Sequence, residues 1–203
     1  MGYSSKLLED AIDALSMLPS VGKKSAMRLA LFLLNEAPEK GNHIGRTIQD
    51  LVQKVQYCKC CHTISDGDLC SICISEHRDE TTICVVESIR DLIAIEETNQ
   101  FKGKYHILGG IISPIEGVGP EDLNIATLVS RVKSDGIKEL IMAISPTIEG
   151  ETTMYYISKL LEGNEVNLSS IARGVAFGGE LEYTDELTLG RSIQTRIPYT
   201  VSQ

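Results

Sequence analysis

The sequence predicts an α/β protein of several domains, in which a helical part and a four-cysteine knuckle precede a parallel α/β domain and a C-terminal hairpin and helix arm. Three observations lead to this prediction. Apolar residues recur at helical spacing through the first 56 residues, and two Cys-x-x-Cys pairs follow at once. From about residue 81, short apolar runs alternate with helical stretches, which is typical of a parallel sheet with covered faces. The predicted domains are residues 1–57, 58–73, 81–176 and 177–203.

Three helices are expected in the N-terminal part, because apolar side chains recur there every three or four residues. Pro19 ends the first helix, and a tight turn through Gly22 leads into the second. A break at residues 38–41 is expected to separate the second helix from the third. The three helices are placed at residues 5–17, 24–35 and 44–56.

The start of the second helix concentrates positive charge. Lys23 and Lys24 follow the turn that ends in Gly22, and Arg28 lies one helical turn beyond Lys24 on the same face. Free backbone N–H groups at a helix N-terminus, together with the helix dipole, favour a phosphate. These three basic residues are therefore candidates for binding a sugar–phosphate backbone without reading bases. The alternative is an ordinary helical hairpin with solvated lysines.

The strongest chemical signal in the chain is the set of Cys58, Cys61, Cys70 and Cys73. Two thiolates on each of two facing turns can enclose one structural Zn²⁺ in a tetrahedral site. Eight residues separate the two pairs, which indicates a small knuckle rather than a finger with its own helix. Two alternatives remain: a pair of disulfides, or a ligand set in which Cys60 or His62 replaces one of the four.

In the α/β part, four short apolar runs alternate with helical stretches. One of these runs contains Cys84, which we interpret as a buried strand residue rather than a ligand. Strands are expected at residues 83–86, 105–108, 139–144 and 166–172, and helices at residues 88–98, 121–133 and 151–161.

Three acidic residues follow strands of this predicted sheet. Glu87 ends the first strand, whereas Glu149 and Glu151 come after the strand at residues 139–144. The carboxyl ends of parallel strands lie at one edge of the sheet and form its ligand crevice, so these carboxylates are candidates for one Mg²⁺. The alternatives are exposed loop acids or an acidic surface that binds a partner.

The tail has a glycine pair at residues 178–179, followed by an alternating segment and a helix expected at about residues 185–196, with Thr184 or Asp185 as its cap. Its acids resemble the end of a nucleotide-hydrolysis motif. However, the chain contains no Gly-x-x-x-x-Gly-Lys-Ser/Thr phosphate loop, so nucleotide hydrolysis is not expected. We interpret the tail as an appended hairpin and helix, an arm that reaches a partner subunit.

Charge is distributed unevenly along the chain. The net charge of −9 argues against a protein that coats DNA uniformly. Residues 1–57 nevertheless carry seven Lys or Arg against six Asp or Glu, and no acid lies between Asp13 and Glu36. Any contact with nucleic acid is therefore expected in the first fifty or so residues. The sequence has no run of eighteen apolar residues and no signal-peptide pattern, so we expect a cytoplasmic protein, with reduced cysteines and no membrane contact.

Four motifs, in order, resemble those of the RecR family of bacterial recombination mediators. Leu18-Pro-Ser-Val-Gly-Lys-Lys-Ser-Ala-Met-Arg28 is similar to the family's helix–hairpin–helix motif, and residues 58–73 are similar to its four-cysteine zinc finger. The segments at residues 82–88, 117–120 and 145–151 resemble its Toprim domain. Gly174-Val-Ala-Phe-Gly-Gly-Glu-Leu-Glu-Tyr183 is similar to its C-terminal signature. The resemblance covers nearly the whole chain.

The resemblance implies a DNA-repair accessory protein that is not an enzyme. Members of this family act with RecO, and in many bacteria with RecF, at gapped or single-stranded DNA, where they help to load RecA. They assemble into homo-oligomers, dimers or tetrameric rings, that clamp DNA. Carried over to this chain, the resemblance makes Lys24 and Arg28 the DNA contacts and Glu149 a contact to RecO. The zinc is then structural.

The chain departs from the family pattern at three positions. The hairpin motif usually reads Leu-Pro-Gly-Ile-Gly-Pro-Lys, whereas Ser20 and Lys23 replace the first glycine and the second proline here. Ser20 is expected to strain the turn if that position needs a positive φ. Catalytic Toprim enzymes carry an Asp-x-Asp pair where this chain has Thr147-Ile-Glu149. The rival hypotheses are a Toprim-type, Mg²⁺-dependent enzyme acting on DNA phosphodiesters, and a protein–protein adaptor without DNA contact.

Overall fold

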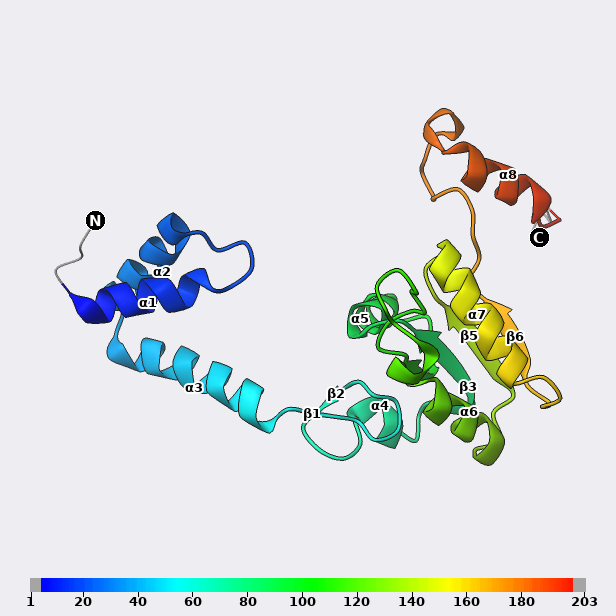
Figure 1. Ribbon diagram of the computed structural model, residues 1–203, viewed down its shortest axis with the longest axis horizontal. Helices are drawn as coiled ribbons and strands as arrows, with labels where there is room; N and C mark the ends of the chain where they lie inside the picture. The colour runs from blue at the N-terminus through cyan, green and yellow to red at the C-terminus, as the bar shows by residue number, and fades with distance from the viewer. Residues whose placement is uncertain (1–4, 199–203) are drawn as a thin grey trace. The chain divides into compact units, whose positions relative to one another are not determined.

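The computed structural model describes residues 5–198. The chain divides into two compact units, and the division falls between Val55 and Gln56. We call the described part of the first the helical unit and that of the second the α/β unit. Each is described by itself, with the elements labelled as in Figure 1.

The helical unit contains three helices, as expected: α1 (Lys6–Ser16), α2 (Lys23–Asn35) and α3 (Pro38–Lys54) (Figure 1). Ile12 of α1 is buried against Ala26 and Ala30 of α2. Small alanine side chains let the two helix backbones approach closely, and this contact holds α1 and α2 as a hairpin. No described residue of α3 is buried.

The expected break at residues 38–41 is wrong. Helix α3 begins at Pro38, with Ala37 in extended conformation as its N-cap. Proline is favoured at the first position of a helix because its ring already holds a helical φ, and an N–H there would have no intrahelical partner. Pro38 therefore starts a helix that the sequence analysis placed six residues further on.

The turn between α1 and α2 has the backbone strain that the sequence suggested. The Val21 N–H donates to the Leu18 carbonyl at 3.1 Å, and Ser20, at the third position of this turn, has a φ of 66°. Pro19 at the second position and a positive φ at the third are typical of a type II turn, whose third residue is normally glycine. The prediction for Ser20 is confirmed.

Replacing Ser20 with glycine is expected to stabilise the helical unit by about 0.5–1 kcal/mol, because the strain of a left-handed residue exceeds the extra unfolded-state entropy of glycine. Amide hydrogen exchange of α1 and α2 in the full chain measures this. Ser25→Gly makes the same change in the helical backbone of α2 and is expected to destabilise the unit. Faster exchange in Ser20→Gly would contradict the strain argument.

The α/β unit contains a four-stranded parallel sheet with the order β4-β3-β5-β6, as the alternating pattern predicted. The strands are β3 (Asp79–Val86), β4 (Gly103–Ile107), β5 (Glu139–Ala143) and β6 (Asn167–Ser170). Side chains of β3 alternate between two cores. Ile83 and Val85 pack on one face, whereas Cys84 and Val86 pack on the other. The interpretation of Cys84 as a buried strand residue is confirmed.

Helices cover both faces of this sheet (Figure 1). Leu128 of α6 (Ile125–Ser134) and Ile157 of α7 (Ile148–Leu160) pack in the core with Ile83 and Val85, whereas Leu92 of α5 (Ile89–Glu97) packs on the opposite face. A 3₁₀ turn at Pro120–Asp122 precedes α6, where the sequence analysis expected the helix itself to begin.

The tail carries the expected helix, α8 (Glu186–Gln194), whose N-cap is Asp185. The Asp185 carboxylate accepts a hydrogen bond from the Thr188 N–H at 2.9 Å. Ahead of it, residues 181–183 form a 3₁₀ turn, where the alternating pattern had indicated a hairpin. The knuckle consists of the hairpin of β1 (Gln56–Tyr57) and β2 (Ile64–Ser65) and the short helix α4 (Ser71–Ile74). The expectation that it has no helix of its own is wrong, because the residues after Cys70 form one helical turn that carries Cys73.

Candidate metal centre and nucleic-acid interface

The N-terminus of α2 is open to solvent. Gly22 is its N-cap in extended conformation and offers no side chain to the first turn, which contains no acid. Lys23, Lys24 and Arg28 are all exposed, and Lys23 forms a 3.8 Å ion pair with Asp13 of α1. Because Lys24 and Arg28 are four residues apart, they project from one face beside the open N–H groups. The structure thus brings the three predicted basic residues to one place.

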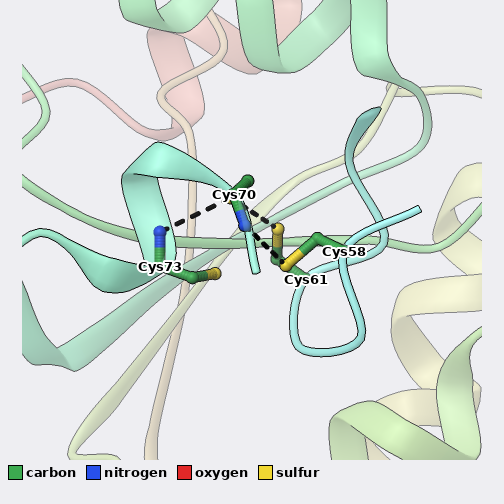
Figure 2. Close-up of side chains that lie close together, drawn as sticks. All are labelled: Cys58, Cys61, Cys70 and Cys73. Carbon is green, nitrogen blue, oxygen red and sulfur yellow. Dashed lines mark hydrogen bonds between the residues drawn. The ribbon is translucent and has the colours of Figure 1, made fainter. Parts of the chain in front are cut away.

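The four predicted metal ligands also lie together. Their Sγ atoms are all within 4.8 Å of one another (Figure 2), and those of Cys61 and Cys70 are 3.5 Å apart. A tetrahedral zinc–thiolate site with bonds of about 2.3 Å places sulfurs roughly 3.8 Å apart, so the cluster fits this metal. In residues 5–198, it is the one group of three or more metal-ligating side chains close enough to share an ion.

Local backbone geometry builds this cluster. The Cys58 N–H donates to the Thr63 carbonyl at 2.7 Å and so closes the first turn. The Cys70 N–H donates to the Cys58 sulfur, and the Cys73 N–H donates to the Cys70 sulfur, each at 3.4 Å. A hydrogen bond with Cys73 lowers the pKa of the Cys61 thiol to about 5. Hydrogen bonds with Cys60 and Cys61 raise the pKa of Cys73, and burial raises the pKa of Cys70, so metal binding, which requires thiolates, must displace protons from these two sulfurs.

Neither alternative ligand, His62 or Cys60, belongs to the group of four sulfurs. His62 directs its Nε2 to the Thr127 hydroxyl at 2.9 Å and packs edge-on against the ring of His106. Cys60 packs against the cluster but stands outside the set of four. All six cysteines are free thiols, so the disulfide alternative has no support in this structure.

The knuckle is bonded to β4, which is the end strand of the sheet. The Ile107 N–H donates to the Cys61 carbonyl at 2.9 Å, and Lys104 Nζ donates to the Cys73 carbonyl at 2.7 Å. Lys104 is 6% exposed and also pairs with Glu80 at 3.0 Å. An uncovered strand edge is a site for unwanted pairing, and here the knuckle covers part of it.

His106 of β4 is buried and adds to the contact between the knuckle and the sheet, because its ring packs against that of His62. The sequence analysis did not identify this residue. The Nε2–H of His106 donates to the Asn124 carbonyl at 2.8 Å, and its Nδ1 accepts from Arg131 at 3.2 Å. Burial lowers the pKa of His106 to about 3, so the ring is neutral at ordinary pH. Its partners lie 18 and 25 residues away, so no local motif could have indicated them.

The three acids of the sheet edge have different surroundings. The Glu87 carboxylate accepts a hydrogen bond from the Ser145 N–H. Glu149 lies in the first turn of α7, where Thr147 caps the helix. Glu151 is paired with Arg173 and lies 3.8 Å from Arg191 of α8. These acids do not form a shared metal-binding group, and the two arginines are partners that the sequence analysis did not foresee.

Three family models for RecR regions and one for the Toprim domain together cover most of the chain. The RecR models match residues 8–52 as the RecR helix-hairpin-helix, residues 55–75 as the RecR zinc finger domain with four cysteines, and residues 174–197 as the RecR C-terminal region. A Toprim domain model matches residues 81–172. With the sulfur cluster, the zinc-finger match assigns one structural zinc ion to the knuckle.

Among residues 5–198, none of the helices has both the length and the apolar character that a membrane-spanning segment needs.

Curated relatives named "Recombination protein RecR" match over nearly their whole length. The relative from Amoebophilus asiaticus is 57% identical over 199 residues, covering 98% of this chain and 100% of its own. The relative from Bacteroides thetaiotaomicron is 53% identical over 198 residues, and that from Porphyromonas gingivalis strain W83 is 52% identical over 200 residues. Each of these two alignments covers 98% of this chain and 97% of the relative.

Proposed function

Because this chain belongs to the RecR family of recombination proteins, we propose that it is a non-catalytic DNA-repair accessory protein. It binds gapped or single-stranded DNA as an oligomeric clamp and, with RecO and in some settings RecF, promotes the loading of RecA. The observation that carries this proposal is the open, basic N-terminus of α2 in a chain whose net charge is −9.

The α2 N-terminus has the chemistry of a phosphate-binding site. Its first-turn N–H groups carry the positive end of the helix dipole, and Lys24 and Arg28 add two full charges nearby. The hairpin core of Ile12, Ala26 and Ala30 fixes the direction of α2. This arrangement supports contact with the DNA backbone, which is sequence-independent.

Assembly into a homo-oligomer multiplies the small positive charge that each protomer presents at the start of α2. In the helical unit, large apolar side chains of α3 are exposed, among them Ile48, Leu51 and Val52. Apolar surface of this kind is typical of a protein–protein interface. Several protomers around one strand would bind more tightly than a single one, because each further contact is intramolecular. We propose a dimer or a tetrameric ring.

Glu149 is our candidate contact for RecO, because it lies partly exposed in the first turn of α7 and makes no ion pair with a described residue. A Mg²⁺-dependent enzyme is the less supported alternative. Glu151 is already paired with Arg173 and lies near Arg191, and Thr147 occupies one place of the usual acidic pair. Phosphodiester chemistry of this type needs clustered acids to hold its metal.

The solution mass of the full chain, measured with and without gapped DNA by light scattering, tests the proposal. The expected result is an oligomer that gains the mass of the DNA and shows a salt-sensitive affinity. A strictly monomeric protein that ignores gapped DNA even with purified RecO present would overturn it. Turnover of supercoiled or primed DNA with Mg²⁺, abolished by Glu87→Gln, would favour the enzyme instead.

A further inference from the structure

The end strand β6 has an open outer edge. The N–H groups of Asn167, at the start of β6, and of Ile171, just after it, donate to carbonyl groups on the β5 side. Backbone groups alternate in direction along a strand, so the N–H and C=O groups of Leu168 and Ser170 point away from β5. They pair with no residue in the described range 5–198. Unlike β4, whose edge the knuckle partly covers, β6 also lacks the lysines and prolines that often protect an exposed edge.

A groove lies beside this open edge. It has a volume of about 1230 Å³ and opens to solvent between β6, α7 and α8. Leu168 and Ser170 line it, together with apolar side chains of α7 such as Tyr155, which is 65% exposed. Cavities that hold small ligands usually have volumes of about 300–1,000 Å³ and enclose most of the ligand. The size and openness of this groove therefore favour a segment of polypeptide over a small molecule.

The groove is positively charged. Three arginines and one acid line it: Arg173, Arg191, Arg196 and Glu151. The three positive charges less one negative charge leave +2, in a chain whose net charge is −9. Arg196 donates to the Ile193 carbonyl at 3.1 Å and forms no ion pair with a described residue. The Nε of Arg173 is buried and has no hydrogen-bond partner in the described range. Because a buried donor without a partner is costly, these groups favour an acidic occupant.

We propose that β6 binds an extended, acidic segment of a partner protein as an added strand of the sheet. The main chain of that segment forms hydrogen bonds with the outward-pointing groups of Leu168 and Ser170. Its side chains alternate between two directions. The apolar ones pack against Tyr155, and the acidic ones pair with Arg191 and Arg196. In this mode of recognition the main-chain hydrogen bonds supply affinity, and the alternate side chains supply specificity.

The tail of this chain is itself acidic at residues 180–186, but it is not extended there. Residues 181–183 form a 3₁₀ turn, and Asp185 caps α8 by accepting the Thr188 N–H at 2.9 Å. Both the turn and the cap would have to break before this segment could lie along β6. An acidic segment that is unstructured before binding has no turn or helix to lose. The occupant is therefore assigned to a partner protein rather than to a second copy of this chain.

Binding of fluorescent peptides to the full-length, zinc-loaded protein, followed by anisotropy, tests the proposal. The probes are two degenerate pools of peptides of about eight residues. Apolar residues alternate with Asp or Glu in one pool and with Lys or Arg in the other. The acidic pool is expected to bind about tenfold more tightly than the basic pool. Arg191→Ala with Arg196→Ala is expected to weaken binding of the acidic pool about tenfold. Arg90→Ala with Lys133→Ala removes two charges outside the groove and is expected to change it by less than about twofold.

Two further measurements test the added strand itself. Ser170→Pro removes an outward-pointing N–H and is expected to weaken binding of the acidic pool about tenfold, because proline is tolerated in an edge strand but cannot donate. Ser170→Ala keeps the N–H and is expected to bind as the unchanged protein does. Amide hydrogen exchange at Leu168 and Ser170 is expected to slow when the unchanged protein is saturated with the acidic pool. This last result does not depend on whether Ser170→Pro folds.

Three results would overturn the proposal. One is that the two pools bind equally or that neither binds. The second is that the two double variants have the same affinity for the acidic pool. The third is that exchange at Leu168 and Ser170 slows with rising protein concentration alone, because another copy of this chain would then cover the edge.

Discussion

Replacing Cys61 with serine is expected to remove the zinc and to destabilise the whole α/β unit. Three thiolates cannot complete the tetrahedral site, and the metal contributes directly to the folding of a small zinc module. The free energy of unfolding of this unit is expected to fall by about 3 kcal/mol or more, because loss of a structural metal is among the largest single-residue effects. Zinc content per chain and the melting temperature, measured together, check this.

The effect is expected to extend beyond the knuckle. Cys61 is buried, and its carbonyl accepts the Ile107 N–H of β4 at 2.9 Å. A knuckle without its metal no longer holds this acceptor in place. Amide hydrogen exchange is therefore expected to accelerate at Ile107 in Cys61→Ser, while the helical unit, which folds around its own core, keeps its protection.

Cys84→Ser is the matched control. Cys84 is 2% exposed in β3, so serine there buries a hydroxyl and is expected to lower the free energy of unfolding by about 1–3 kcal/mol. It is nevertheless expected to retain one zinc per chain, because Cys84 is not a ligand. An unchanged melting temperature and full zinc content in Cys61→Ser would sink the idea of a structural metal.

The zinc site was predictable because its information is local. Two ligand pairs of fixed spacing specify which sulfurs come together, and the structure places all four within 4.8 Å. The parallel sheet was also predictable, since β3 and β5 contain short apolar runs and strands alternate with helices along this part of the chain. Positive φ at Ser20 could be inferred from one substitution in a known turn pattern.

Tertiary contacts were beyond sequence reasoning. A lysine is normally expected at the surface, yet Lys104 is buried. Its ammonium group is satisfied by the Cys73 carbonyl, 31 residues away in sequence, and by Glu80. The pairing of Glu151 with Arg173 is likewise set by how the chain returns to α7 after β6. Pro38 was misread for a different reason: the same ring that ends one helix can begin the next.

The double substitution Lys24→Ala and Arg28→Ala is expected to abolish most DNA binding without changing the oligomeric state. Both side chains are exposed on one face of α2, and neither forms an ion pair with any residue in the described range 5–198. Their charges are therefore available to phosphates. We expect affinity for gapped DNA to fall by about 10–100-fold, with the slope of log K against log salt reduced by about 2 per engaged protomer.

Lys40→Ala with Lys54→Ala is the control that separates this site from overall charge. It removes the same two charges from the helical unit, but Lys40 is paired with Glu36 at 3.2 Å and Lys54 with Asp50 at 2.8 Å. Because acids already neutralise these lysines, their loss is expected to change affinity by less than about threefold. If both double variants weakened DNA binding equally, the affinity would depend on overall charge rather than on the start of α2. If neither did, the start of α2 would not be where this protein holds DNA.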